Sequence, residues 1–154
     1  MTEAMTNSGG KVAICTTPQN TALDLSDFEA LTYVDIAKVG QLGERGANTN
    51  ILTYDTWDTD VALKGKGIIN AGDPVLEVAY DPEDPGQIAL QTAALDKAGN
   101  YAFEVTRQDG SKQYLRGLVT GPSEPGGRNE DFVIHNYTLA LNQLPIEAPA
   151  PVGP

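Results

Sequence analysis

The chain has 154 residues, 21 of them acidic and 10 basic, so its formal net charge is -11 at pH 7. This length is typical of one domain that buries a core. We expect an N-terminal arm at residues 1–10, one domain at 11–143 and a proline-rich C-terminal segment at 144–154. The acidic balance argues against proteins that bind nucleic acid through a basic patch, and against binding to anionic membranes.

The chain offers little material for a disulfide or a metal site. Cys15 is the one cysteine and His135 the one histidine, so neither an internal disulfide nor a multi-histidine metal site can form. Residues 1–10 lack the basic start and apolar run of a secretion signal. Apolar stretches also stay well short of the ~20 residues that span a bilayer. We therefore expect a protein of the cytoplasm with no metal and no cofactor.

Short segments rich in β-branched and aromatic residues alternate with 16 glycines and 10 prolines, which predicts a mainly β fold. Between them, the segments 16–30 and 41–50 show little regular pattern, and loops of this length are usually functional or mobile. In chain order the expected strands are 11–15, 31–39, 50–55, 67–70, 75–80, 101–107, 113–120 and 132–141.

The clearest element is a hairpin over 101–120, because Asp109-Gly110 separates two alternating runs and supplies positive φ angles for a tight turn. Alternation divides the strands at 75–80 and 101–107 into a large apolar face and a small face. Glu77 and Glu104 are each the lone charge on the small face. The large faces consist of Leu76, Val78 and Tyr80 in the first strand and Tyr101, Phe103 and Val105 in the second.

One helix is predicted from about residue 85 to 98, with Asp84 as N-cap, Pro85 in the first turn and Gly99 just past the end. It has two apolar stripes instead of one. Either the helix is sandwiched within the subunit, or the second stripe contacts another chain. The stripes lie on nearly opposite sides, with Leu90, Ala93 and Ala94 on one and Ile88 and Leu95 on the other.

Motifs that carry chemistry are weak throughout. Gly65-Lys-Gly67 is followed by Asn70 in place of a third glycine, which argues against a phosphate loop. His135 has no nucleophile motif near it in sequence, so a structural role is favoured over general-base catalysis. Two acidic runs lack calcium-loop spacing and are interpreted as solvated turns: Asp55, Asp58 and Asp60, and Asp81, Glu83 and Asp84. The sequence gives no positive reason to expect an enzyme.

A consecutive series of short features resembles one known family over residues 39–142. The chain is similar to the tail tube proteins of long, non-contractile-tailed (lambda-like) bacteriophages. Each feature is weak alone, but their order and spacing together are specific. They are Ala37-Lys-Val39, Gly43-Glu44, Lys64-Gly-Lys-Gly67, Ala71-Gly-Asp73, the strand at 75–80, Pro85-Gly-Gln87, Asp109-Gly110, Arg116-Gly117, and a glycine-rich connection before the last strand.

The resemblance implies a β-sandwich or small barrel with one flanking helix and long loops, forming hexameric rings that stack into a tube in the virion tail. Implied partners are further copies of the chain, a tape-measure protein, a tail terminator and distal tail proteins, with viral DNA as a transient, non-sequence-specific cargo. An acidic channel wall suits that cargo because it repels phosphate. Two alternatives stay open: a ring protein of a type VI-like secretion tube, and an isolated ligand-binding β-sandwich.

Two groups of residues are candidates for such an assembly. We expect Glu77 and Glu104 to face the lumen, the alternative being a solvated outer surface. We expect the segment at 41–50 to reach an adjacent ring or subunit and to become ordered only on assembly, because it bears glycines and adjacent opposite charges. Its candidate residues are Gln41, Gly43, Glu44, Arg45, Gly46 and Asn48.

Overall fold

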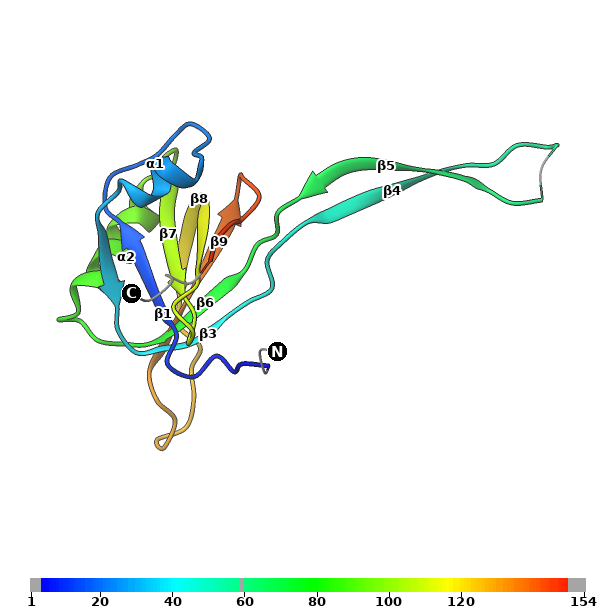
Figure 1. The fold of residues 1–154 in the computed structure, drawn as a ribbon. Helices are drawn as coiled ribbons and strands as arrows, with labels where there is room; N and C mark the ends of the chain where they lie inside the picture. The colour runs from blue at the N-terminus through cyan, green and yellow to red at the C-terminus, as the bar shows by residue number, and fades with distance from the viewer. Residues whose placement is uncertain (1–3, 59, 150–154) are drawn as a thin grey trace.

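The computed structural model describes residues 4–58 and 60–149. Within them the chain is mainly β, as predicted, with two short helices (Figure 1). Neither helix is long and apolar enough to cross a lipid bilayer. The elements in order are β1 (Lys11–Cys15), α1 (Leu25–Glu29), β2 (Tyr33–Ile36), β3 (Val39–Leu42), β4 (Asn48–Tyr54), β5 (Leu63–Asn70), β6 (Val75–Ala79), α2 (Pro85–Leu95), β7 (Tyr101–Thr106), β8 (Lys112–Ser123), β9 (Ile134–Leu141) and β10 (Ile146–Ala148).

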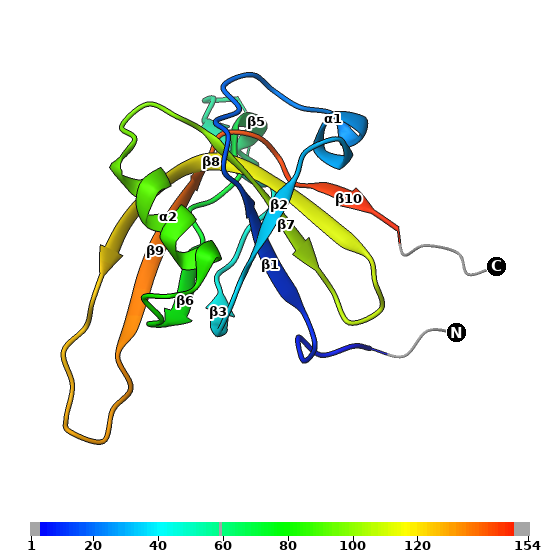
Figure 2. The same ribbon diagram turned by 90° about the vertical axis from the view of Figure 1, so that its left-hand side faces the viewer.

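One antiparallel sheet, with strand order β2-β1-β7-β8-β9-β6-β3, forms the body, and β10 adds to β8. Its edge strands β2 and β3 are joined by only two residues, Ala37 and Lys38, and Lys38 has a φ of 61°. Such a short connection spans roughly 10 Å at most, so the sheet must curl until its two edges approach each other (Figure 2). The predicted single strand at 31–39 is therefore wrong. The segment is divided at Ala37 and Lys38 into β2 and β3, which form opposite edges of the sheet.

The main core lies between the inner face of this curled sheet and α2, which crosses it from β8 to β2. The predicted division of the strands into faces is confirmed for five large residues: Leu76, Val78, Tyr101, Phe103 and Val105 are all buried here. Tyr80 is the exception. It lies beyond the end of β6, is 39% exposed and stacks on His135.

A second, smaller core covers part of the outer face of the sheet. It is built by α1, which lies inside the segment 16–30 that shows little pattern in sequence. Asp24 caps this helix in a reciprocal capping box with Asp27. Phe28 is fully buried and stacks on Tyr114 at 5.2 Å between ring centroids. Cys15, Ala102 and Ala148 complete the cluster.

The Asp109-Gly110 hairpin is confirmed. Gly110 has a φ of 90°, its N–H donates to the carbonyl of Arg107, and Arg107 in turn donates to Ser111. The loop is thus a three-residue connection with glycine in the left-handed position.

Helix α2 begins as predicted at Pro85, with the Asp84 carboxylate accepting from the N–H of Gln87. It ends at Leu95 instead of residue 98, because Asp96 accepts from the backbone of Ala98 and Gly99 and from the hydroxyl of Tyr101.

The two apolar stripes of α2 have different environments. Leu90 and Ala93 are buried, whereas Ile88 is 49% and Leu95 83% exposed. Burial of both stripes within the subunit is therefore wrong, and contact of the second with another chain stays a prediction.

The C-terminal segment contributes to the body as far as residue 149. Strand β10 pairs with β8, and Ala148 is buried. Glu147 accepts two hydrogen bonds from the guanidinium of Arg107, at 2.7 and 3.0 Å. The sequence predicts a domain that ends at residue 143, whereas β10 extends the sheet of the body to Ala148.

Truncation after Gln143 should therefore lower the free energy of unfolding by about 2 kcal/mol, or Tm by roughly 4–8 °C. Thermal melts compare this variant with a truncation after Pro149, which keeps β10 and should melt within about 2 °C of the full chain. Equal melting of both truncations would show that β10 does not stabilise the body.

Candidate functional site

The most unusual surface of the protein is a projecting arm, residues 48–70, formed by β4 and β5 (Figure 1). Within the described residues these two strands pair only with each other. An isolated two-stranded hairpin is marginally stable in water, because it has no third layer against which to bury its side chains.

The arm nevertheless carries a high density of exposed apolar side chains. Each is at least half exposed, and Trp57 near the tip is fully exposed at 106%. Exposed apolar patches of this kind mark surfaces that another molecule covers. The residues are Ile51, Leu52, Tyr54, Trp57, Val61, Leu63, Ile68 and Ile69.

The pairing register gives the two faces of the arm different chemistry. One face is apolar, with Tyr54 opposite Leu63 and Leu52 opposite Gly65. The other face is basic, with Lys64 and Lys66 opposite Thr53 and Ile51. Around Trp57 the tip is acidic and exposed, with Asp55, Asp58 and Asp60. In the part of the chain that the structure describes, no His, Cys, Asp or Glu residues form a group that could hold a metal ion.

The segment 41–50 is predicted to reach an adjacent ring or subunit and to become ordered only on assembly, and this contact stays a prediction. Gln41 belongs to β3 and Asn48 to β4. The connection between them is held on the body: Gly43 donates to the carbonyl of Val75 at 2.9 Å and Gly46 to that of Ala71 at 3.0 Å. Next to Glu44, Arg45 donates to Gln113 and to the carbonyl of Gly43. This segment is the root of the arm, and the projecting part begins where it ends.

Both predicted lumen carboxylates lie on the outer face of the sheet. Glu104 is only 17% exposed beside α1, and its carboxylate pairs with Lys112 at 3.3 Å. Glu77 lies on the part of the face that α1 and β10 leave uncovered, in a polar row across β3, β6, β9 and β8. This row consists of Gln41, Glu77, Asn136 and Ser123. Glu77 also lines a shallow hollow of about 340 Å³ with Glu44 and Asp73.

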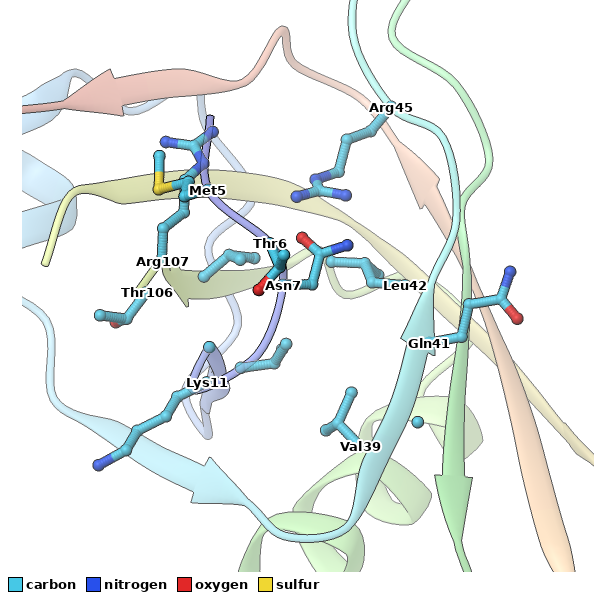
Figure 3. Close-up of a pocket in the computed structure, with 14 residues that line it drawn as sticks. Met5, Thr6, Asn7, Lys11, Val39, Gln41, Leu42, Arg45, Thr106 and Arg107 are labelled. Carbon is cyan, nitrogen blue, oxygen red and sulfur yellow. The ribbon is translucent and has the colours of Figure 1, made fainter. Parts of the chain in front are cut away.

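A cavity of about 420 Å³ opens where the curled sheet fails to close, between β1 and β7 on one side and β3 on the other. The N-terminal segment forms one wall with Met5, Thr6 and Asn7 (Figure 3). The floor is apolar, with Val12, Val39, Leu42 and Val105. Gln41 borders the cavity, but its side chain points away from it (Figure 3).

The charged residues of this cavity are all basic. Lys11, Arg45 and Arg107 line it, and none of its described lining residues is acidic. Burial and the neighbouring Arg107 lower the pKa of Arg45. Both guanidiniums share one carboxylate, Glu147, whose hydrogen bond from Arg107 holds its pKa below the usual range. The cavity therefore has surplus positive charge in a protein of strongly negative net charge.

The Glu147 carboxylate gives a pH-dependent contribution to stability. Its pKa is depressed in the folded state, so its contribution is present above the unfolded value of about 4.3 and is lost as the pH falls through the folded value. We expect Glu147→Gln to cost at most about 1 kcal/mol at pH 7, because the pair is exposed. Denaturant melts should show this difference shrinking below pH 4; a constant difference would contradict it.

His135 has a structural position. Its Nε2 lies 2.7 Å from Glu124, and its ring stacks on Tyr80 with centroids 4.4 Å apart. Cys15 is buried in the second core, where its thiol donates to the carbonyl of Thr17.

Comparison with known proteins finds the fold of this chain in several solved structures. No protein-family model matches the chain, and neither does any curated protein. A chain of the anti-feeding prophage baseplate, 6-fold symmetrised, aligns with a TM-score of 0.65 and 12% identity over 99% of this chain and 100% of that one.

Two further solved structures share the fold. A chain of the sheath/tube terminator of an extracellular contractile injection system, in the extended state, gives a TM-score of 0.63 and 10% identity, covering 96% of this chain and 99% of that one. A chain of the anti-feeding prophage tube terminating cap gives a TM-score of 0.64 and 11% identity, covering 97% of this chain and 94% of that one. At such low identity these likenesses establish the fold alone.

Proposed function

We propose that this chain is a structural, non-enzymatic subunit of a phage-like tail, and specifically a tube subunit that forms hexameric rings. The observation that carries the proposal is the arm, whose apolar side chains are left exposed by the isolated subunit. The fold supports it, because chains from three injection-system structures share it over nearly their whole lengths. One of those assemblies is 6-fold symmetrised.

Assembly into a ring fits the shape of the arm. The arm projects from one side of the body (Figure 1), so it can reach a different surface on a second copy. Such a head-to-tail contact closes into a ring when the rotation between copies divides a full turn. Stacked rings would then make the tube.

The outer face of β3, β6, β9 and β8 is the proposed channel wall, with Glu77 in its polar row. Six copies that each give four strands to a common barrel, spaced about 4.8 Å apart and tilted about 40°, close at a backbone radius of roughly 24 Å. Side chains leave a channel of roughly 35–40 Å, which admits a DNA duplex. Glu104 is a weaker lumen candidate, because Lys112 neutralises its charge.

The sequence resembles tube proteins of non-contractile tails, whereas one of the three similar structures comes from an extracellular contractile injection system and two from the anti-feeding prophage. We favour viral DNA as cargo and a tape-measure protein, a tail terminator and distal tail proteins as partners. A secretion-type tube is the second candidate, because two of the similar chains belong to the anti-feeding prophage and one to an extracellular contractile injection system. Sequencing of nuclease-protected DNA in purified particles distinguishes the two.

Shortening the arm tests the proposal. Thr49 pairs with Ile69, so an Asn-Gly turn can replace residues 50–68 without disturbing the body. We expect the wild-type protein to form rings and tubes in electron micrographs, and the shortened variant to stay a monomer that melts within about 5 °C of wild type. Normal tubes from the shortened variant would show that assembly does not require the arm. A wild-type protein that forms no rings at any concentration would contradict the function itself.

A further inference from the structure

The arm tip and the open cavity have complementary chemistry. The tip presents a fully exposed indole flanked by three aspartates. The cavity presents an apolar floor with Arg45 and Arg107 beside it, and Lys11 borders it with its side chain pointing outward (Figure 3). We propose that the tip of one copy inserts Trp57 into the cavity of the next copy, with Asp55, Asp58 and Asp60 against Lys11, Arg45 and Arg107. This inference rests on the proposed function and names the contact that joins neighbouring subunits.

The size and lining of the cavity suit an indole. Its 420 Å³ lies within the range of pockets that bury drug-sized groups. The floor residues Val12, Val105 and Leu42 offer apolar contact. Arg45 and Arg107 can lie over the ring face, where cations are attracted to the π-system. Buried Trp and Arg are also the residues that most often dominate the binding energy of an interface.

Charge favours the same pairing. Glu147 acts on both Arg45 and Arg107, and Asp109 acts on Arg107 as well. With Lys11, these three cations still outnumber the two carboxylates. In a chain with net charge -11, most other surfaces would repel the aspartates of the tip. Electrostatic complementarity of this kind selects the partner surface and raises the association rate.

The geometry matches a ring. From Asn48 to Trp57 the arm extends roughly 30 Å, at about 3.3 Å per residue. A body of roughly 120 residues has a radius of gyration of about 14 Å, and hence a diameter of about 35 Å. The arm is thus about one body long, and its tip reaches the position on the next copy that corresponds to its own root. The cavity adjoins that root, because Leu42 and Arg45 line it.

The experiment uses Trp57 as its own reporter, because it is the one tryptophan of the chain. A cavity variant, Lys11→Glu with Arg45→Glu, keeps a normal tip. A tip variant, Trp57→Ala, keeps a normal cavity and contains no tryptophan. The control variant, Lys97→Glu, has the same lysine-to-glutamate substitution as the one at Lys11, but at an exposed residue beyond the end of α2. Circular dichroism and thermal melts first establish that all are folded.

In wild type and in the control variant we expect the tryptophan emission to shift to shorter wavelength as the protein assembles. Each of the other two variants alone should associate at least about tenfold more weakly. When the two variants are mixed in equal amounts, sedimentation should detect a heterodimer. The normal tip of the cavity variant can bind only the normal cavity of the tip variant. The emission of the cavity variant should then shift, because its Trp57 enters the cavity of the tip variant.

Two results would overturn the inference: wild-type rings whose Trp57 emission stays that of a solvated indole, or mixed variants that give no heterodimer and no shift while wild type assembles. Both leave the proposed function standing. Conversely, a heterodimer with shifted emission from a protein that never closes rings supports the tip-to-cavity contact and contradicts the ring.

Discussion

Gly86→Ala should destabilise the body by at least about 3 kcal/mol, even though alanine is normally the better helix former by about 1 kcal/mol. Gly86 lies in the first turn of α2, against β2. A Cβ at this position would lie 2.2 Å from the carbonyl oxygen of Asp35 and 2.6 Å from the Cα of Ile36. Both are backbone atoms, so neither can move aside without displacing the strand. Steric overlap therefore outweighs helix propensity.

Moving α2 outward to relieve the overlap would break a second set of contacts. The Gln87 side chain is 2% exposed and donates to the carbonyls of Ala37 and Ala79, while it accepts from the N–H of Asp81. Asp84 also accepts from the N–H of Ala37. These bonds hold the β2–β3 connection, and hence both edges of the sheet.

Urea unfolding of Gly86→Ala measures the effect. The matched control is Gly126→Ala, because a Cβ at Gly126 meets nothing within 4 Å. It should change stability by less than about 0.5 kcal/mol. A stabilised Gly86→Ala variant would show that the helix can shift at no cost and that the close contact is not required.

The segment Pro85-Gly-Gln87 shows which features of the fold can be predicted from the sequence and which cannot. Caps, turns and alternation predict the start of α2, the Asp109-Gly110 hairpin and the large faces of the strands, because each depends on residues that are close in sequence. What α2 contacts depends on residues 50 positions away, such as Ala37. The sequence offers no signal for such a contact.

Misplaced elements have similar causes. The segment 31–39 has the composition of one strand, and a single left-handed residue, Lys38, divides it between opposite sheet edges. Strand β10 lies in a proline-rich stretch and is stabilised by the distant Arg107. Helix α1 has only five residues, too few for a periodic pattern, although the Asp24–Asp27 capping pair was a usable signal.

The candidate site was the least predictable part. The apolar residues of the arm resemble those of buried strands, so their exposure could not be read from composition. The basic cavity combines residues from β1, β3, the arm root and the end of β7, which only the tertiary structure brings together. The segment 41–50, predicted to contact an adjacent ring or subunit, forms the root of the arm, and that contact stays a prediction.

Phe103→Ala should lower the free energy of unfolding by about 3–5 kcal/mol, a large part of the 5–15 kcal/mol that stabilises a typical domain. Phe103 is fully buried in β7, between Ile14 of β1 and Leu115 of β8. The curled sheet cannot collapse onto the cavity left behind without shifting several paired strands. Phe132→Ala makes the same chemical change where the ring is 86% exposed, and should alter stability by less than about 0.5 kcal/mol. Thermal melts of both variants, followed by electron microscopy, separate folding from assembly. A Phe103→Ala chain that melts like wild type and still forms tubes would show that the main core does not depend on this side chain.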